Sequence, residues 1–394
     1  MLIDDLQVTK ECLTAPQLLT IRRYLHQIPE LALQEYETSE TLKTIIAQFD
    51  QQYLEVITVP DLPTAVLVKV QGKNARRTLG YRTDIDALAV TEDNDLAFKS
   101  IHPGKMHACG HDIHMTVALG LLSYFASHQP TDNIIFIFQP AEENFAGGMR
   151  LYQSGILSGP NHIDELYALH TNPDLAAGTI GCRNGTLFAG TTEIHAEFTG
   201  ISGHAAFPHQ ANDMVVALSQ WLVQLQTIVA RNVDPIKGGV VTIGNVSAGT
   251  ANNVIAGSAQ AHGTIRALQQ DTIDLIKMRV EAITMGIEAS FGCQIELTLN
   301  QDGYFPVVNE SKITQRFIKY VENNPEIKYI ETQPAMTGED FGYLLSKIPG
   351  MMFWLGVDSP ASLHSSKYVA NEDAIMTAVK TMIGFIESRM KEED

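Results

Sequence analysis

The sequence predicts an α/β fold: a domain with a mixed sheet flanked by helices, plus an inserted α+β domain. Short apolar runs that suit strands buried on both faces alternate with helical patterns before residue 184 and after residue 300. Residues 185–299 instead follow a β-α-β-β-α order, typical of a small module with helices on one face of its sheet. The length of 394 residues also exceeds what one compact core holds. We therefore expect a discontinuous first domain, residues 1–184 and 300–394, and an inserted domain over residues 185–299.

Composition and charge limit which partners the protein can bind and in which cellular compartment it is expected. Hydrophobic residues make up 45% of the chain, enough for a sizeable core. The net charge of −18 argues against nucleic acid and anionic membranes as partners. The N-terminus lacks the basic and apolar regions of a signal peptide, and no apolar run is long enough to span a bilayer. Four scattered cysteines favour a reducing compartment. These features predict a soluble cytoplasmic protein.

The N-terminal part of the chain contains two helical patterns and two strand patterns, over residues 17–26, 38–49, 64–70 and 78–81. The second strand runs into Asp84 and Asp86. Carboxylates just past a strand are candidates to support a metal site from behind its ligands. Aspartates in loops more often form turns, so alone these two predict little.

Residues 105–115, Lys-Met-His-Ala-Cys-Gly-His-Asp-Ile-His-Met, concentrate three histidines, one cysteine and one aspartate. Borderline-soft metal ions such as Zn²⁺ prefer thiolate, imidazole and carboxylate ligands. Gly110 lets the backbone turn tightly, so Cys109 and His111 can converge on one point. A helical apolar pattern follows at once, and a helix N-terminus favours the thiolate form of Cys109. The alternative is a buried structural cysteine among surface histidines.

A buried strand is expected over residues 134–138, and it runs into Gln-Pro-Ala-Glu-Glu at 139–143. Two glutamates at the end of a buried strand are costly unless they have a task. One can bind a metal ion while its neighbour acts as general base, which makes Glu142 and Glu143 candidates for these roles. The alternative is a pair of acids at a helix N-terminus, which Pro140 also fits.

Two further histidines follow apolar strand patterns. His170 ends the pattern at 166–169, and His364 lies in the loop after residues 351–355. In open α/β sheets the ligand crevice lies outside the carboxyl ends of the strands. We therefore expect these histidines to share one site with the paired glutamates and the 105–115 segment. One thiolate, three imidazoles and one or two carboxylates suit two metal ions.

The inserted domain carries weaker candidates. Its expected strands and helices cover residues 192–198, 213–229, 240–243, 260–266 and 271–289. His204 stands in a glycine-flanked loop, where an exposed histidine is usually unremarkable unless the domain closes over the metal site. Arg266 could pair with a substrate carboxylate through two hydrogen bonds, or could make a surface salt bridge. Asn253 is a further candidate for substrate binding.

Five motifs occur in the same order as in a known protein family. They are Met-His-Ala-Cys-Gly-His-Asp at 106–112, Gln-Pro-Ala-Glu-Glu at 139–143, Gly-His-Ala-Ala at 203–206, Gly-Glu-Asp-Phe at 338–341 and Leu-His at 363–364. They resemble the aminoacylase-like dinuclear metallopeptidases and amidohydrolases. Within that family the chain looks like the branch that contains hippurate hydrolase and the plant auxin-conjugate hydrolases. The resemblance covers nearly the whole chain. It implies a catalytic α/β domain and an inserted lid domain that usually forms a homodimer.

Carried over position by position, the resemblance implies two divalent metal ions (Zn, Co, Ni or Mn). The implied ligands are Cys109, placed between the ions, His111, Glu143, His170 and His364. Glu142 would be the general base and Asp84 a supporting carboxylate, while His204 would reach the active site of a partner subunit. The departures from the common pattern, Asn144 and Ser365-Ser366, remove no ligand.

The implied reaction is hydrolysis of an N-acyl amide, with removal of an acetyl group from an amino acid. Glu142 would take a proton from the attacking water and pass it to the leaving amine. Two alternatives stay open. One is a broader N-acyl-amino-acid or hippurate-type hydrolase, and the other, from a different class, is a non-catalytic metal-dependent binding protein.

Overall fold

The structure is a computed structural model, and it describes residues 12–392. The chain forms two compact units. The first comprises Met1–Leu187, Val308–Gln333 and Tyr343–Asp394, and the second comprises Phe188–Val307 and Pro334–Gly342. The α/β fold expected from the sequence is confirmed, because one unit has a mixed sheet with helices and the other a smaller antiparallel sheet with two long helices.

The unit bounds differ from the sequence-based boundaries at 185 and 299, and most clearly at Pro334–Gly342. The sequence predicts that this segment belongs to the first domain, whereas it packs with the second unit. The amide of Ala189 donates to the carbonyl of Ala335 at 3.0 Å, and Nη1 of Arg266 donates to the carbonyl of Met336 at 2.9 Å. Such long-range contacts leave no pattern in the local sequence.

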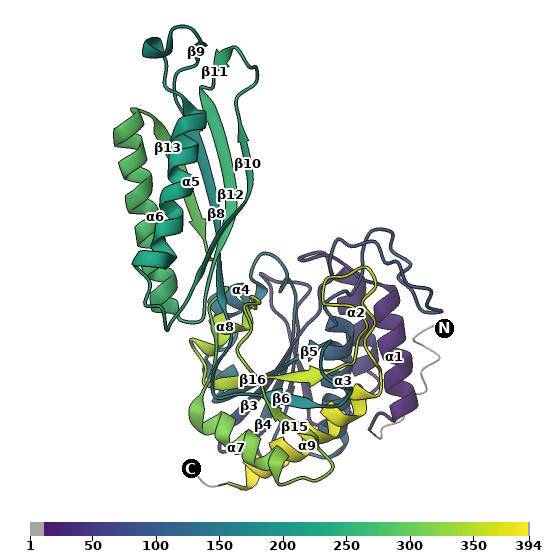
Figure 1. The fold of residues 1–394 in the computed structure, drawn as a ribbon. Coiled ribbons are helices and arrows are strands. Elements are labelled where there is room, and N and C mark those ends of the chain that lie inside the picture. Colours follow the sequence, from purple (N-terminus) through teal and green to yellow (C-terminus); the bar gives the residue numbers. More distant parts are fainter. Residues whose placement is uncertain (1–11, 393–394) are drawn as a thin grey trace. The chain divides into compact units, whose positions relative to one another are not determined.

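The first unit is built on an eight-stranded mixed sheet (Figure 1). In spatial order its strands are β1 (Leu54–Ile57), β2 (Val66–Val70), β4 (Asn133–Gln139), β3 (Thr78–Asp84), β5 (Glu165–Asn172), β16 (Gly350–Gly356), β6 (Ile180–Cys182) and β15 (Tyr329–Glu331). The central strands β4, β3, β5 and β16 run parallel to one another. Their carboxyl ends therefore gather at one edge of the sheet, where the sequence analysis expects the site.

Two of these strands are longer than their apolar cores. β5 pairs with β16 from Leu166 opposite Gly350 to Asn172 opposite Gly356, so His170 lies inside the strand and not just past its end. β3 likewise continues to Asp84, which is paired with Gln139 of β4. Pairing with a neighbouring strand extends each strand through polar residues that the hydrophobic pattern alone would exclude.

Five helices of the first unit are α1 (Ala15–Gln27), α2 (Tyr36–Ile46), α3 (His111–Ser127), α7 (Ser311–Glu322) and α9 (Ala374–Lys391). Shorter helical elements of this unit are α4 (Gly147–Gln153) and η2 (Gly159–Asn161), and α8 (Phe341–Leu345) spans the point at which the chain returns to it. α3 is buried over nearly its whole length because it contacts α1, α9 and the sheet. An almost uniformly apolar helix is stable only in such a setting, and here it fixes the residues at its N-terminus deep inside the protein.

The second unit has a four-stranded antiparallel sheet in the order β10 (Val240–Ala248), β12 (Ser258–Ala267), β8 (Gly190–Thr199) and β13 (Gln294–Asn300). α5 (Met214–Arg231) and α6 (Gln270–Phe291) lie side by side along one face of it (Figure 1). Their shared core includes Trp221, whose Nε1 donates to Oγ1 of Thr284 at 2.9 Å. The smaller elements are β9 (Gly203–His204), η3 (Pro208–Gln210) and β11 (Val254–Ile255). β7 (Gly185–Phe188) and β14 (Val307–Asn309) pair where the chain passes from one unit to the other.

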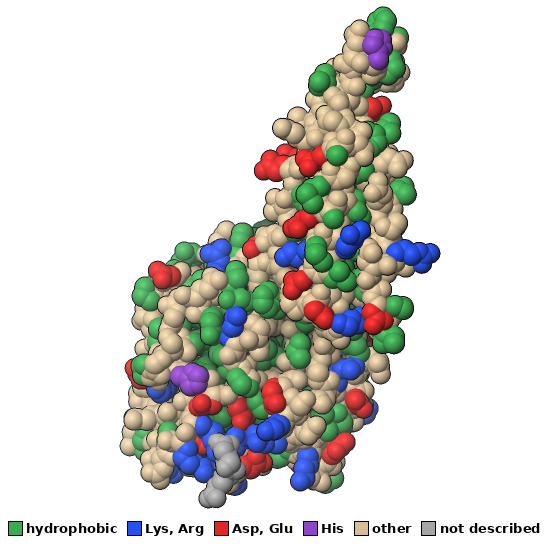
Figure 2. All heavy atoms as spheres, turned by 90° about the vertical axis from the view of Figure 1, so that its left-hand side faces the viewer, with side chains coloured by type: hydrophobic (Ala, Val, Ile, Leu, Met, Phe, Trp, Pro, Cys, Tyr) green, Lys and Arg blue, Asp and Glu red, His purple; other side chains and the backbone are tan. Residues whose placement is uncertain are grey.

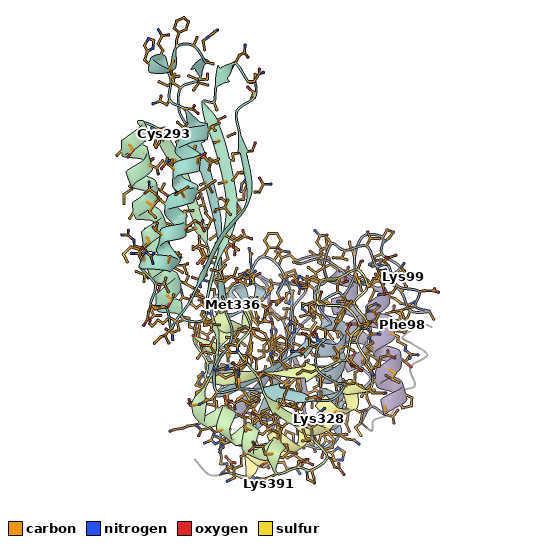
Figure 3. The ribbon with its side chains drawn as sticks, in the orientation of Figure 1. Phe98, Lys99, Cys293, Lys328, Met336 and Lys391 are labelled. Carbon is orange, nitrogen blue, oxygen red and sulfur yellow. The ribbon has the colours of Figure 1, made fainter. Side chains whose placement is uncertain are left out.

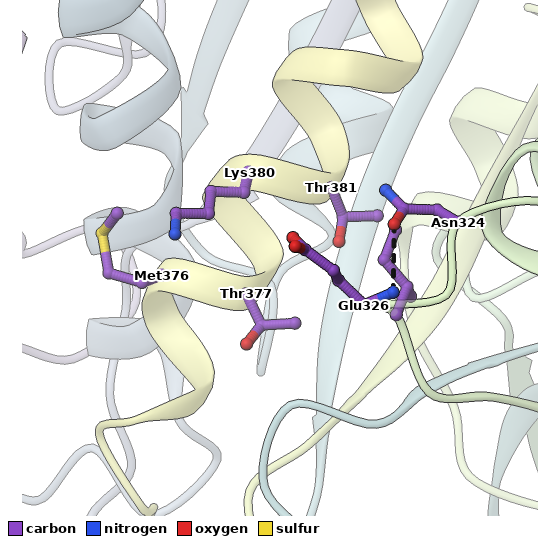
Figure 4. A pocket seen from close by; sticks show the side chains of 7 residues that line it. Asn324, Glu326, Met376, Thr377, Lys380 and Thr381 are labelled. Atoms are coloured by element: carbon purple, nitrogen blue, oxygen red, sulfur yellow. Dashed lines mark hydrogen bonds between the residues drawn. The ribbon is translucent and has the colours of Figure 1, made fainter.

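A cavity of about 180 Å³ lies in the first unit, between α9 and the turn that follows α7 (Figure 4). It is lined by Asn324, Glu326, Ile327, Met376, Thr377, Lys380 and Thr381. None of these residues belongs to the motifs that predict metal binding. Over the part of the chain that the structure describes, no helix is both long and apolar enough to cross a membrane.

Candidate metal centre

The candidate site lies where the four parallel strands end. Asp84 is the last residue of β3, and His170 lies near the end of β5. Glu142 and Glu143 follow β4, and His364 lies in the loop after β16. Cys109 and His111 reach the same edge because α3 begins there.

The turn between Cys109 and His111 requires glycine. Gly110 has φ of +91°, a region that side chains with a Cβ rarely adopt. A Cβ at this position would lie 2.5 Å from Oγ1 of Thr171 and 2.8 Å from the hydroxyl of Tyr368. The hydroxyl of Thr171 donates to the carbonyl of Cys109 at 2.8 Å and so holds the turn from the β5 side. The tight turn expected from the sequence is therefore present, and neighbouring side chains lock it.

Buried carboxylates hold the backbone of the paired glutamates. Oδ1 of Asp86 accepts from the amide of Glu142 at 3.0 Å, and Oδ2 accepts from the amide of Glu143 at 2.9 Å. Oε1 of Glu35 accepts from the amide of Ala141 at 2.9 Å. Ala141 has φ of +60°, a strained conformation for alanine that persists only when its surroundings impose it. These three bonds therefore hold the backbone from which the two glutamate side chains project.

The five expected ligands lie together in the first unit. Sγ of Cys109 is 3.4 Å from Nε2 of His170, and Nε2 of His364 is 3.5 Å from Oε1 of Glu143. Nε2 of His111 is 3.8 Å from Oε1 of Glu143. Two sets of potential ligand atoms each lie within 4.8 Å of one another: Cys109 with His111 and His170, and Cys109 with Glu143 and His364. Because Cys109 belongs to both sets, the geometry suits two neighbouring ions that share its sulfur.

Two buried atoms without hydrogen-bond partners in the described part of the chain indicate whether a metal ion fits this site. Nε2 of His111 and Oε1 of Glu143 are buried and find no hydrogen-bond partner among the described residues. Buried polar atoms are normally satisfied, so both atoms call for a ligand of another kind. A divalent cation would satisfy both. The set of sulfur, nitrogen and oxygen donors suits Zn, Co, Ni or Mn.

Hydrogen bonds on the far side of the rings orient the histidines. Nδ1 of His111 lies 2.9 Å from the carbonyl of Asp86, and Nδ1 of His170 lies 2.9 Å from the carbonyl of Thr171. A carbonyl can only accept, so each Nδ1 carries a proton and each Nε2 is the ring nitrogen left to face the cluster; at His111 a cation would have to displace a second proton from Nε2. Histidines that bind metals usually have this support. The sequence could not reveal it because the partners are backbone atoms.

Charge at the site favours cations. Burial lowers the pKa of His111, but the carboxylates of Asp84 and Asp86 outweigh this and raise its pKa to about 10. Burial and the nearby Asp86 raise the pKa of Glu143 to about 7, against the opposing charge of His111. Burial holds the pKa of His170 well below its usual value, so this imidazole is neutral, as a metal ligand must be. The excess of carboxylate charge is what a bound cation would balance.

Asp84 lies beside the candidate ligands, and its expected role as a supporting carboxylate stays a prediction. It is fully buried, and its Oδ1 lies 2.6 Å from Nδ1 of His114. Its Oδ2 accepts from Nη1 of Arg82 at 2.8 Å and lies 3.8 Å from Nε2 of His111. Nε2 of His114 in turn accepts from the amide of Thr171 at 3.0 Å. Asp84 therefore connects the cluster to β5 through a chain of hydrogen bonds.

A second buried network was missed by sequence reasoning. Asp112 lies 3.0 Å from Nε of Arg22 and 2.7 Å from Nδ1 of His26. Nε2 of His26 lies 3.2 Å from Glu92. The ring of Phe98, labelled in Figure 3, lies 4.9 Å from the guanidinium carbon of Arg22. This network ties the first turn of α3 to α1, across a sequence separation that no local pattern spans.

The three candidates of the inserted domain belong to the second unit. His204 is exposed in β9 and pairs with Val254 of β11, and its Nδ1 accepts from the amide of Ala206 at 3.0 Å. Asn253 is exposed in the turn before β11, and its carbonyl accepts from the amide of Ala205 at 3.2 Å. Arg266 lies in β12, where it donates to the carbonyl of Met336, as described above.

Comparison with known proteins agrees with the class that the fold and the cluster define, a metal-binding α/β protein with an inserted α+β unit. A family model described as Peptidase family M20/M25/M40 matches residues 80–388. The chain belongs to this family.

Individual relatives match over nearly the full length. A protein of Limosilactobacillus reuteri (strain DSM 20016) named N-acetyldiaminopimelate deacetylase is 56% identical, over 96% of this chain and 100% of its own. A protein of the same name from Lactiplantibacillus plantarum is 59% identical, over 94% and 97%. Among solved structures, the Bacillus subtilis YXEP protein, described as a dinuclear metal binding peptidase, has a TM-score of 0.83 at 28% identity, over 96% and 99% of the two chains. A Staphylococcus aureus protein reaches a TM-score of 0.89 at 29% identity, over 99% of both.

Proposed function

We propose that the protein is a metal-dependent amidohydrolase. Its substrate would be N-acetyl-LL-2,6-diaminopimelate, and its products LL-2,6-diaminopimelate and acetate, in lysine biosynthesis. The observation that carries the proposal is the convergence of one thiolate, three imidazoles and a carboxylate beside a second carboxylate, Glu142. Several relatives that are 54–59% identical over nearly the whole chain bear the name N-acetyldiaminopimelate deacetylase. Residues 225–235, 336–343 and 353–360 also resemble that deacetylase more than other members of the branch.

Cys109, His111, Glu143, His170 and His364 would hold two divalent ions. Such ions polarise an acyl carbonyl and lower the pKa of water. Glu142 supplies the proton transfer: its carboxylate is almost fully buried at the cluster, with Oε2 3.8 Å from Nε2 of His111. It takes a proton from the attacking water and delivers it to the nitrogen of the leaving amine. Asp86 holds the backbone of Glu142 beside the cluster.

The proposal extends to the inserted unit as a lid that forms a homodimer. Its helical face carries exposed apolar side chains, among them Val223 of α5 and Met278 and Met285 of α6. Figure 2 shows hydrophobic side chains scattered among charged ones on this face. In such a dimer His204 would donate to the developing oxyanion in the partner's site, while Arg266 and Asn253 would contact the far end of the substrate. A cytoplasmic location is part of the same proposal.

The direct test is acetate release by protein loaded in turn with Zn²⁺, Co²⁺, Ni²⁺ or Mn²⁺. The substrates are N-acetyldiaminopimelate, other N-acetyl amino acids and hippurate, compared by kcat/KM. The highest value is expected for N-acetyldiaminopimelate. A clear preference for hippurate would favour the broader N-acyl hydrolase. Bound metal and bound ligand without acetate release would favour a binding protein.

Glu142→Gln is the matched control because it keeps the shape of the side chain but cannot accept a proton. We expect kcat to fall by about 10²–10⁴-fold while the metal content stays at the wild-type value. Activity equal to wild type would show that another group is the base.

The role of His204 is tested in mixed dimers. His204→Ala subunits carry an intact Glu142, and Glu142→Gln subunits carry an intact His204. If the histidine acts across the dimer, mixing the two inactive variants restores part of the activity. Verified mixed dimers that stay inactive would contradict action across the dimer.

A further inference from the structure

Two histidines face each other on the open side of the sheet in the second unit. His195 of β8 and His262 of β12 are direct cross-strand partners. On β8 the buried residues Ile194, Ala196 and Phe198 contribute to the core beneath α5 and α6. Side chains alternate along a strand, so His195 and its cross-strand partner point to the opposite face, away from the helices. Both histidines are partly buried there.

The ring nitrogens of the pair are arranged as a chelate. Nδ1 of His195 lies 2.9 Å from Nδ1 of His262. Nε2 of His195 lies 3.2 Å from Oε2 of Glu193. A carboxylate accepts, so Glu193 places the ring proton of His195 on Nε2 and leaves a lone pair on Nδ1. The space between the two Nδ1 atoms then holds either the proton of His262 or an ion that replaces it.

The spacing matches a metal ion. Two nitrogen ligands about 2.0–2.1 Å from one ion and at right angles to each other, as in square-planar Cu²⁺ or Ni²⁺ sites, lie about 2.9 Å apart. A carboxylate on the far nitrogen of a liganding histidine is the usual support for such a bond, and Glu193 has that place. Glu197 and Glu296, directly opposite each other on the same face, add negative charge nearby. The arrangement therefore has the ligands, the spacing and the charge that a cation needs.

We propose that His195 and His262 form a binding site for Cu²⁺ or Ni²⁺. Imidazole nitrogen suits these ions, and water completes the coordination. The residues of the site belong to the second unit alone, so it is additional to the dinuclear centre. With two protein ligands instead of the larger set around Cys109, it binds more weakly than that centre. An ion here links the two central strands β8 and β12 and stabilises the folded unit by mass action.

The experiment uses the untagged, full-length protein and Ni²⁺ as the probe. Isothermal titration and metal analysis measure how many equivalents bind. Wild type is expected to bind one weak equivalent beyond those of the dinuclear centre. His262→Asn and His195→Asn should each lose that equivalent. His209→Asn, which changes an exposed histidine elsewhere in the same unit, should retain it. Glu193→Gln should retain it with an affinity about 10–100-fold lower.

A Cys109→Ser background separates this site from the dinuclear centre. In that background Ni²⁺ should still raise the melting temperature of the protein, and the rise should be smaller when His262→Asn is added, while His209→Asn should leave it unchanged. The electron paramagnetic resonance spectrum of bound Cu²⁺ should show two nitrogen ligands that His262→Asn reduces to one. Equal Ni²⁺ binding by wild type and His262→Asn, or no weak equivalent in wild type, would overturn the proposal. Neither result depends on acetate release, so the proposed function is tested independently.

Discussion

Glu35 should make the stability of the metal-free first unit depend on pH. Its side chain is fully buried, and Oε1 accepts from the amides of Leu33 and Ala141, each at 2.9 Å. Burial, with a smaller contribution from the charge of Asp86, raises the pKa of Glu35 to about 7 from an ordinary value of 4.5. The folded protein therefore binds a proton that the unfolded chain releases between these two pH values.

The sign and size of the effect follow from linkage. A raised pKa in the folded state gives a contribution to stability that is complete below pH 4.5 and is lost as pH rises through about 7. At about 1.4 kcal/mol per unit of pKa, the loss is about 3 kcal/mol. Glu35→Gln keeps an acceptor oxygen for both amides but cannot ionise, so this loss should disappear. Glu35→Ala instead leaves the buried amide of Ala141 and the partly buried amide of Leu33 without this acceptor, and should cost about 2–4 kcal/mol at every pH.

The assay is urea unfolding of metal-free protein between pH values of about 5 and 8. The chain has two tryptophans, Trp221 in the second unit and Trp354 in β16 of the first. In a Trp221→Phe background, the fluorescence of Trp354 reports unfolding of the first unit. The free energy of unfolding should fall more steeply with rising pH in the protein that retains Glu35 than in the one that also carries Glu35→Gln. Parallel curves for these two proteins would refute the reasoning.

Three other substitutions test the packing around the site and in the second unit. Asp86→Asn replaces one of the two carboxylate oxygens that accept from the amides of Glu142 and Glu143. It should lower the free energy of unfolding in urea by about 1–3 kcal/mol, and kcat/KM or metal affinity about 10–100-fold. Wild-type values in both assays would contradict this. Gly110→Ala places a Cβ at a φ of +91° and against Thr171. It should lower the free energy of unfolding by about 2–5 kcal/mol, seen as a lower melting temperature, and reduce the metal content. Full metal content at an unchanged melting temperature would count against the locked turn. Trp221→Phe removes the hydrogen bond to Thr284, so it should lower the stability of the second unit by about 1–2 kcal/mol and leave metal content unchanged; loss of metal would show that its effect is not local.

Local composition was enough to predict most strands and helices. The apolar runs at 134–138 and 351–355 became β4 and β16, because strands buried on both faces need uninterrupted apolar residues. The pattern failed where tertiary contacts decide. Pairing carries β5 past His170, and hydrogen bonds from Ala189 and Arg266 hold Pro334–Gly342 against the second unit. The α/β fold is therefore confirmed, with element ends and one segment corrected.

The site was predictable to the extent that its chemistry is local. Cys109, Gly110 and His111 adjoin in the sequence, and the paired glutamates adjoin as well, so residue type and spacing pointed to both segments. The assignment of the five ligands and of Glu142 as base stays a prediction that the geometry supports. Glu35 and the Arg22–His26–Asp112 network were not predictable, because an acid before a helix and a histidine within one have many ordinary roles. Only the fold shows that these side chains meet partners far away in the sequence.

The sulfur of Cys109 belongs to both groups of potential ligands, so under the proposed assignment the loss of Cys109 and the loss of His364 have different consequences. Damage to His364 removes a donor from one group and leaves the other complete. Alkylation or oxidation of the Cys109 thiol removes a donor from both groups at once. We therefore expect modification of Cys109 to lower metal binding at both proposed ion positions together, whereas loss of His364 should lower it at one.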